Sequence, residues 1–163
     1  ILFGAGHYSL ALTPVLRSVG FRVTVFDDRP DLITPERFPA AERLICGDFS
    51  HIDRYLSCSA EDYIVVMTSG HTHDFIVQEQ ILRRNFAYVG VIGSRAKTAS
   101  VNARLRAAGV QETAIASVHT PVGVAIKAVT PEEIAVSIAG EMIYERALRR
   151  EKEGPRHHGC PMR

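Results

Sequence analysis

Two glycines near the start of the chain have the spacing of a phosphate-binding turn. The sequence begins Ile-Leu-Phe-Gly-Ala-Gly-His-Tyr-Ser. Where such a turn joins a strand to a helix, the helix N-terminus offers free N–H groups and a positive dipole end to a phosphate. We expect Gly4 to make the turn, Gly6 to let a ligand approach the backbone, and Ser9 to replace the usual third glycine. His7 would begin the helix and face the ligand, or else be an ordinary surface histidine.

A carboxylate lies at the spacing expected for recognition of a ribose. Asp27 ends the run Arg-Val-Thr-Val-Phe-Asp, 21 positions after Gly6. An acid about 20 residues beyond the turn commonly binds ribose hydroxyls in dinucleotide-binding folds. Arg29 is placed to meet a 2′-phosphate instead, but the neighbouring Asp28 would repel one. The pattern therefore favours an adenosine-like ribose over NADP, with a purely structural turn as the alternative.

Two further loops are expected at the same edge of the sheet, because ligands gather beyond the carboxyl ends of parallel strands. Thr68–Asp74 reads Thr-Ser-Gly-His-Thr-His-Asp, and Gly93–Lys97 reads Gly-Ser-Arg-Ala-Lys. Ser94 can cap the helix that follows, while Arg95 and Lys97 can offer positive charge to an anion. The candidate cofactor-binding residues of these segments are Gly4, Gly6, His7, Ser9, Asp27, Asp28, Gly70, His71, Gly93, Ser94 and Arg95.

The histidines of the second loop raise the question of a metal site. His71 and His73 stand two apart, and Asp74 adjoins them. Zinc sites usually need three or four ligands with supporting contacts, so we expect no metal site, and Asp74 is equally explained as a helix cap. No Ser–His–Asp set, Cys–His pair or carboxylate pair has a telling spacing. The catalytic residues therefore stay unassigned.

Composition narrows the class of protein. The 163 residues carry a net charge of +1 and are 46% hydrophobic and 23% charged, as in globular domains, so no basic field indicates nucleic acid. Three cysteines without Cys-x-x-Cys spacing fit a reducing cytoplasm, and Cys46 is expected to be a small buried hydrophobe. No apolar run approaches the roughly 20 residues of a membrane helix.

The elements that position these residues alternate between apolar β-rich runs and helical patterns. This alternation is typical of a doubly wound, Rossmann-type α/β domain with a parallel sheet and helices on both faces. The expected strands are Ile1–Phe3, Arg22–Phe26, Arg43–Cys46, Tyr63–Met67 and Ala87–Ile92. Helices are expected over Leu10–Val19, from about Phe75, over Ala96–Ala108, and from Thr130 to about Arg150.

Helix boundaries carry recognisable signals. Gly20 and Gly109 are placed to end their helices, and Thr-Pro-Glu-Glu from Thr130 predicts an N-cap, a first-turn proline and a capping box. The apolar face of this last helix is predicted to consist of Ile134, Ile138, Met142 and Ile143. The segment from His119 to Gly123 is expected at the sheet edge. We predict one domain over residues 1–150 and a flexible tail over 151–163.

Taken together, these stretches resemble the C-terminal Rossmann domain of the xanthine dehydrogenase accessory factor (XdhC/CoxI) family. The matching segments follow the family's order: GAGHYSLAL, VTVFDDRP, YIVVMTSGHTHD, YVGVIGSRAKT and HTPVGVAIKAVTPEEIAVSIAGEMI. GSRAK and TPEEIAVSI are the most specific. One departure is Ser69, where the family commonly has arginine, so a possible contact with an anion is missing.

The resemblance implies a maturation factor, a cofactor-binding chaperone rather than a turnover enzyme, for molybdenum hydroxylases such as xanthine dehydrogenase or aldehyde oxidoreductase. It would bind the molybdenum cofactor, as molybdopterin or a nucleotide form, support its sulfuration and pass it on. The implied partners are the apo-hydroxylase and a cofactor sulfurase. A homodimer is expected separately, because the long C-terminal helix and the exposed sheet edge need cover, and the cysteines predict a cytoplasmic location. The phosphate would meet Gly4, Gly6 and His7. A ribose or pterin edge would meet Asp27, and the far side would be lined by Gly70, His71, Ser94 and Arg95.

Two other functions fit the same residues: an NAD(P)-dependent oxidoreductase and a regulatory NAD(P)- or nucleotide-binding module. A dehydrogenase needs an acid or base near the nicotinamide, and only His7, His71 or His119 could serve. Because the chain opens within an expected strand and without methionine, we expect it to be the C-terminal part of a longer protein. The family's additional N-terminal domain, with its cysteine, lies outside this sequence.

Overall fold

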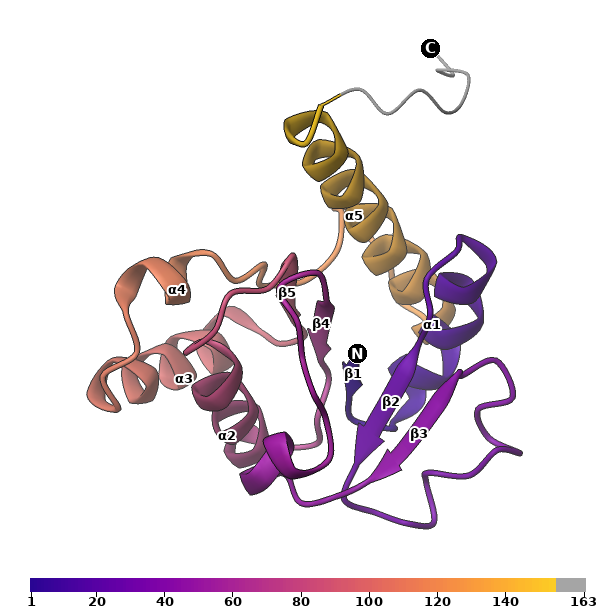
Figure 1. Cartoon of the computed structure of the whole chain (residues 1–163), viewed down its shortest axis with the longest axis horizontal. Helices are drawn as coiled ribbons and strands as arrows, with labels where there is room; N and C mark the ends of the chain where they lie inside the picture. Colours follow the sequence, from indigo (N-terminus) through magenta and orange to yellow (C-terminus); the bar gives the residue numbers. More distant parts are fainter. Residues whose placement is uncertain (155–163) are drawn as a thin grey trace.

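One parallel sheet organises the chain, whose computed structural model describes residues 1–154 (Figure 1). The five strands lie in the order β3-β2-β1-β4-β5, and every pair is parallel. Their bounds are β1 Leu2–Phe3, β2 Thr24–Asp27, β3 Arg43–Cys46, β4 Tyr63–Val66 and β5 Tyr88–Val91. The chain builds outward from β1 to β3 and then returns to β4. The predicted doubly wound Rossmann-type fold is confirmed, and its switch point lies between β1 and β4.

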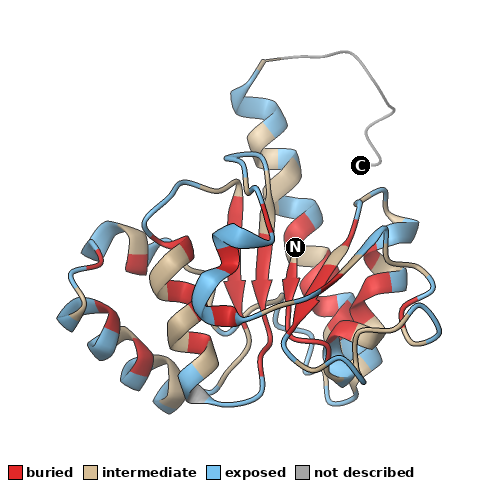
Figure 2. Cartoon of the chain, turned by 60° about the horizontal axis from the view of Figure 1, so that its bottom comes forward, coloured by how far each residue is buried: buried red, intermediate tan, exposed pale blue. Residues whose placement is uncertain are grey.

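Alternation along the strands creates two apolar layers. Leu2 pairs in register with Val25 and Val65, and all three are buried on the face that α1 and α5 cover. The next residue, Phe3, pairs with Phe26 and is buried on the opposite face, against α2 and α3. Figure 2 shows buried residues filling the strands and the inward sides of the helices. Strands covered on both faces read as continuous apolar runs, which is why the sequence revealed them.

Helices occupy the predicted places with small shifts at their ends. The helical segments are α1 His7–Ser18, the 3-10 helix η1 Phe49–Arg54, α2 His71–Ile81, α3 Arg95–Ala107, α4 Glu112–Ala116 and α5 Pro131–Lys152. Gly20 and Gly109 have φ of 87° and 78°, as expected where a helix ends in a left-handed residue. Thr130 and Glu133 form the predicted capping box. The sequence did not reveal η1 or α4.

The long helix α5 packs along α1, and Ile138 and Met142 supply its buried centre. One part of the predicted apolar face is wrong, because Ile143 is 38% exposed. Its position follows Met142 by one residue, about 100° around the helix and toward solvent. α5 also runs to Lys152, two residues past the predicted domain boundary at 150, and residues 155–163 of the predicted tail lie outside the described residues.

The residues at the two edges of the sheet, beside β5 and in β3, test two predictions made from the sequence. Beyond β5, His119 bridges Gly90 in parallel, and the Val122 N–H donates to the Val91 carbonyl at 3.1 Å. The prediction that this segment lies at the sheet edge is therefore confirmed. On the other edge, the prediction of a buried Cys46 is wrong. Cys46 is the last residue of β3, and its side chain is exposed because β3 is the outermost strand of the sheet.

Candidate cofactor-binding site

The first turn lies where β1 ends, beside the end of β4. Gly4 has a φ of +106°, which an L side chain rarely adopts. A Cβ on Gly4 would lie 2.7 Å from the carbonyl carbon of Met67, and the Gly4 N–H donates to the Phe26 carbonyl at 2.8 Å. Gly4 makes the predicted turn, and it does so because three strand ends meet there.

Gly6 has a different environment from Gly4. It is the N-cap of α1 with a φ of −76°, and no side chain caps the helix. A Cβ built on Gly6 would meet nothing within 4 Å. His7 follows as the first helical residue and is exposed. The N-terminus of α1 therefore has no side-chain cap, an arrangement suited to an anion.

Ser9 shapes this turn from inside. Its hydroxyl is fully buried and donates to the Gly4 carbonyl, and the Thr13 hydroxyl donates to the Ser9 carbonyl at 2.7 Å. Serine thus fits where the usual third glycine would allow close packing. Because the hydroxyl is committed to the backbone, Ser9 supports the turn and presents no polar group at the surface.

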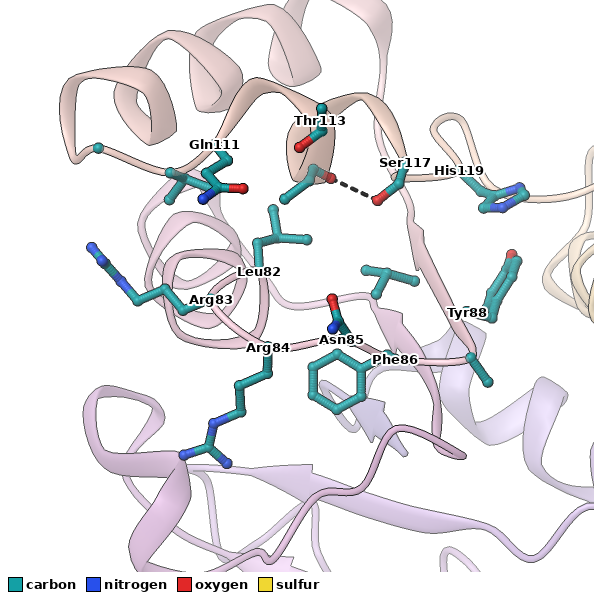
Figure 3. Close-up of a pocket in the computed structure, with 15 residues that line it drawn as sticks. Leu82, Arg83, Arg84, Asn85, Phe86, Tyr88, Gln111, Thr113, Ser117 and His119 are labelled. Carbon is teal, nitrogen blue, oxygen red and sulfur yellow. Dashed lines mark hydrogen bonds between the residues drawn. The ribbon is translucent and has the colours of Figure 1, made fainter.

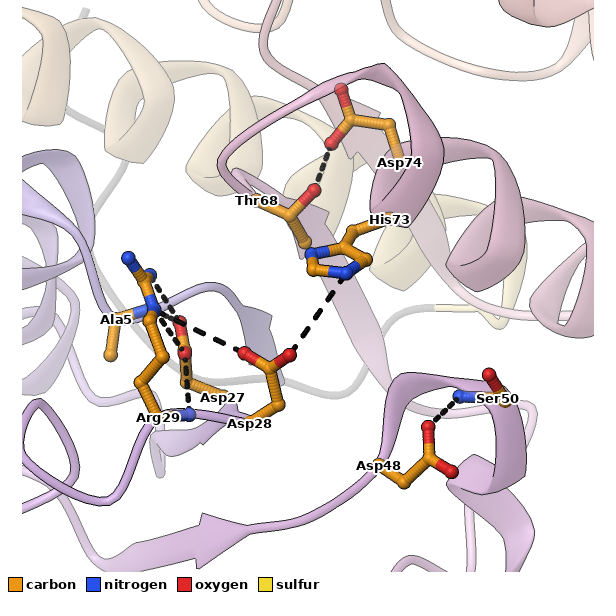
Figure 4. A network of polar contacts seen from close by, with 9 residues as sticks. All are labelled: Ala5, Asp27, Asp28, Arg29, Asp48, Ser50, Thr68, His73 and Asp74. Atoms are coloured by element: carbon orange, nitrogen blue, oxygen red, sulfur yellow. Dashed lines mark hydrogen bonds and ion pairs between the residues drawn. The ribbon is translucent and has the colours of Figure 1, made fainter.

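Asp27 is the centre of a compact polar network (Figure 4). Its side chain is 1% exposed and accepts a hydrogen bond from the Ala5 N–H at 2.6 Å. Arg29 contributes its own N–H at 3.0 Å, Nε at 2.8 Å and Nη2 at 2.9 Å. Burial alone would raise the pKa of Asp27, but the hydrogen bonds from Arg29 and Ala5 outweigh it and lower the pKa below its ordinary value. Asp27 is an anion that the protein itself satisfies.

Asp28 points toward His73 of α2, away from the first turn (Figure 4). Its Oδ2 lies 3.9 Å from His73 Nε2, and its Oδ1 lies 4.0 Å from Arg29 Nε. The His73 ring packs on Phe49, with ring centroids 5.0 Å apart. Asp28 therefore connects the end of β2 electrostatically with the start of α2.

The second loop repeats the arrangement of the first. Gly70 has a φ of +105° and is the N-cap of α2, again without a side-chain cap, and a Cβ there would meet nothing within 4 Å. The helix begins at His71, so the suggestion that Asp74 caps it is wrong. Asp74 lies inside the first turn, fully buried, where it accepts a hydrogen bond from Thr68 and pairs with Lys97. The side chain of His71 lies outside what the structure describes.

The third loop joins β5 to α3. Ser94 is the N-cap and accepts a hydrogen bond from the Lys97 N–H at 3.3 Å, so the predicted cap is confirmed. Arg95 is exposed at the first helical position. The side chain of Lys97 crosses Gly93, where a Cβ would lie 3.3 Å from its Cδ, and reaches Asp74. Lys97 is therefore engaged inside the protein, and Arg95 is the base that remains at the surface.

Sequence comparison places this arrangement in a family. The sequence model of the XdhC Rossmann domain matches residues 1–142. The chain belongs to the XdhC Rossmann domain family. The resemblance found in the sequence is therefore confirmed, and with it the family's Rossmann fold.

Relatives of this XdhC domain extend well beyond it. It is 32% identical over 146 residues to a Bacillus subtilis (strain 168) protein named as a probable xanthine dehydrogenase subunit, covering 90% of this chain and 42% of that protein. It is 30% identical over 144 residues to YqeB of Escherichia coli (strain K12), covering 88% and 26%. The crystal structure of a xanthine dehydrogenase from Bacillus halodurans matches it with a TM-score of 0.83 and 28% identity, covering 94% of this chain and 44% of that one. The chain thus spans less than half the length of these relatives.

The carboxyl edge of the sheet in the XdhC domain offers helix N-termini at which an anion is favoured. The α1, α2 and α3 N-termini gather at the carboxyl edge of the sheet, and two of them start at glycine without a side-chain cap. Within residues 1–154, no group of three or more His, Cys, Asp or Glu side chains is arranged to hold a metal. Over the same residues no helix is long and apolar enough to cross a membrane. His157, His158 and Cys160 lie outside the described part.

A polar cluster that sequence reasoning missed lies beside β5 in the XdhC domain. Glu141 of α5 accepts hydrogen bonds from the Tyr88 hydroxyl at 2.6 Å and the Gly123 N–H at 3.0 Å, and His119 Nδ1 lies 3.1 Å away. Tyr88 and His119 also border a cavity of about 750 Å³ that extends past the start of β5, away from the glycine turns (Figure 3). Glu141 lies 53 positions after Tyr88, so no local spacing signals this contact.

Proposed function

We propose that this chain is the cofactor-binding domain of a maturation factor for molybdenum hydroxylases, in which the molybdenum cofactor binds at the carboxyl edge of the sheet. The relatives named for xanthine dehydrogenase supply the hydroxylase class. The observation that carries the proposal is the uncapped first turn of α1 at Gly6, together with a second glycine-capped helix, α2, that follows the neighbouring strand at the switch point.

The residues present fit a phosphate-bearing cofactor. A Cβ at Gly6 would stand in free space in front of the α1 N-terminus, so glycine keeps open the place where a phosphate would lie. His7 and Arg95 are exposed at the first positions of α1 and α3 and could donate to the phosphate. We assign phosphate binding to Gly6 and His7, and the far wall to Gly70 and Arg95. When bound, the cofactor would supply the molybdenum centre that the hydroxylase uses, and this chain would hold it for sulfuration and insertion.

Binding of NAD(P) is the second candidate, because the strand order and the Gly-x-Gly turn are those of dinucleotide-binding folds. The buried Asp27 weighs against NAD, since its carboxylate already accepts four hydrogen bonds. An accessory role without turnover agrees with both candidates.

Partners of the domain would be an apo-hydroxylase, a cofactor sulfurase and a second copy of the chain, all in the cytoplasm. Exposed apolar side chains on one face of α5 support contact with another chain: Val136 is 56% exposed and Tyr144 60%. We propose the homodimer along this face. Val136→Lys with Tyr144→Lys should convert a dimer to a monomer in light scattering, and an unchanged mass would refute that interface.

Thermal denaturation with the molybdenum cofactor, NAD and NADP tests the main proposal. A ligand at about 100 Kd adds roughly 2.7 kcal/mol to the free energy of unfolding, which raises Tm by about 5 to 10 °C in a domain of this size. We expect the shift with the molybdenum cofactor and its loss in Gly6→Val. Gln111→Val is the matched control, because Gln111 is likewise an N-cap without a side-chain hydrogen bond. A shift by NAD alone would refute the proposal.

A further inference from the structure

We propose that Arg29, and not the carboxylate of Asp27, is the group that β2 presents to the ligand, and that it selects a phosphomonoester over a ribose diol. The inference rests on the proposed function only in placing the ligand at the carboxyl edge of the sheet. It names the chemistry that the residues beside the first turn would recognise.

Asp27 has no acceptor capacity left for a ribose. A carboxylate has about four lone-pair sites, and Asp27 accepts four hydrogen bonds from Ala5 and Arg29. Its side chain is only 1% exposed. A ribose diol would have to displace Arg29 or the Ala5 N–H, and the displaced donor would lose a charge-assisted hydrogen bond. The usual role of an acid at the end of the second strand is therefore blocked by the chain itself.

Arg29 is held with its cationic edge outward. Two of the five guanidinium N–H groups are used on Asp27, from Nε and Nη2. Within residues 1–154, Nη1 has no hydrogen-bond partner, and the side chain is 41% exposed. Because Asp27 fixes the plane of the guanidinium, little rotamer entropy remains to be lost when an anion binds to the free edge.

Asp28 still repels an anion, as expected from the sequence, but its contact with Arg29 is to Nε and not to Nη1. Its carboxylate extends toward His73, while the guanidinium of Arg29 stands beside Ala5 of the first turn (Figure 4). Asp28 Oδ1 lies 4.0 Å from Arg29 Nε, beyond hydrogen-bond distance. The Ala5 N–H and Arg29 Nη2 share the same oxygen of Asp27. The free edge of Arg29 is therefore next to the turn that opens α1, where an anion is also favoured.

A phosphomonoester dianion is the ligand chemistry that matches this edge, because planar guanidinium groups bind its terminal oxygens in pairs. It could come from two sources. One is the terminal phosphate of the molybdenum cofactor, which the cytidine dinucleotide form lacks because its phosphates are linked. The other is the 2′-phosphate of NADP, which NAD lacks.

Two matched ligand pairs test the inference on the whole protein. Fluorescence titration would compare NADPH with NADH, and thermal denaturation would compare the cofactor with its cytidine dinucleotide. We expect the phosphomonoester of at least one pair to bind about 10-fold tighter or more, since a paired contact to a charge commonly has at least this effect. Arg29→Gln should abolish the preference. Arg29→Lys keeps the charge beside Asp27 and should retain part of it.

Arg22→Gln is the matched control, because Arg22 lies before the opposite end of β2 and is 82% exposed. Far-ultraviolet circular dichroism establishes that each variant is folded. Equal affinity of the wild type for both members of both pairs, or a preference kept in Arg29→Gln, would overturn the inference. Binding of the molybdenum cofactor without any preference would support the proposed function and refute the inference on Arg29. A preference for NADPH with no effect of the molybdenum cofactor would support the inference on Arg29 and refute the proposed function. If no probe binds, both are refuted.

Discussion

Gly4 packs directly against the backbone of Met67, so that the turn after β1 touches the end of β4 with no side chain between them. The Met67 N–H donates to the Phe3 carbonyl at 2.8 Å and fixes the two strands at this point. The two glycines of the turn therefore have different roles. Gly4 allows close packing of the turn on the end of β4, and Gly6 leaves the N-terminus of α1 without a side chain in front of it.

Alanine should destabilise the protein much more at Gly4 than at Gly6. Gly4→Ala places a Cβ on the Met67 carbonyl at a φ of +106°, and backbone strain with overpacking should cost about 3 kcal/mol or more. Gly6→Ala adds its Cβ to free space and should cost about 1 kcal/mol or less as a poorer N-cap. Urea unfolding of both variants measures this. Equal costs would show that the turn is not held as described.

Much of the fold follows from patterns that sequence physics makes visible. Strands covered on both faces give near-continuous apolar runs, and the bounds predicted for Arg43–Cys46 are those observed. Capping signals worked as well, because Thr130 and Ser94 act on N–H groups three residues away. The glycine turn and the helix that follows it likewise depend on residues close together in the sequence. These features depend on neighbours in sequence, which is why one sequence suffices to find them.

The errors share the opposite cause. Asp74 is not a helix cap, because α2 begins at His71, and its partner Lys97 lies on the next helix. The spacing of Asp27 gave its place in the fold correctly, but could not reveal that Arg29 turns back on it. Cys46 and Ile143 are exposed because the covered area of their strand or helix ends before it reaches them. Tertiary partners and the limits of each covered face are not encoded in local periodicity.

The Asp27–Arg29 contact should make stability depend on acid pH. Since the pKa of Asp27 is lowered below its ordinary 3.8, the contribution is complete above that value and is lost as the pH falls through the folded-state pKa. Asp27→Asn should be about 2 kcal/mol less stable at pH 7, and the difference should shrink below about pH 4. Urea unfolding from pH 7 to 3 checks this, with the exposed Asp31→Asn as control. A gap independent of pH would contradict the assignment.

Lys97 should matter far more for stability than its neighbour Arg95. Lys97 is 19% exposed and pairs with the buried Asp74, whereas Arg95 is exposed. Lys97→Met leaves Asp74 charged with only Thr68 beside it, and should cost about 3 kcal/mol. Arg95→Met should stay within about 0.5 kcal/mol.

Differential scanning calorimetry of Lys97→Met and Arg95→Met measures this difference. We expect Tm to fall by roughly 6 to 12 °C in Lys97→Met and to change little in Arg95→Met. Adding Asp74→Asn to Lys97→Met should recover part of the loss, because the buried charge is then gone. The single variant Asp74→Asn completes the cycle. If the loss of stability in the double variant equalled the sum of the losses in Lys97→Met and Asp74→Asn, the proposed coupling between Lys97 and Asp74 would be absent.

Glu141 should be the contact that holds α5 to the β5 edge. Burial and then Glu141 itself raise the pKa of Tyr88 far above its ordinary value, so the phenol keeps its proton and donates. Glu141→Ala leaves the Tyr88 hydroxyl and the Gly123 N–H without their acceptor, at a cost of about 2 to 4 kcal/mol. In Tyr88→Phe the same substitution should cost less, because one orphaned donor has been removed.

A double-mutant cycle of these two positions by urea unfolding gives the coupling energy, for which we expect about 1 kcal/mol or more. Glu151→Ala on the same helix is the control, since Glu151 is exposed near the C-terminal end and its removal should be neutral. Hydrogen exchange adds a spatial readout: Glu141→Ala should speed exchange of the Val122 and Gly123 amides while sparing β1. A coupling near zero with unchanged exchange would mean that the apolar contacts of Ile138 and Met142 hold the helix without Glu141.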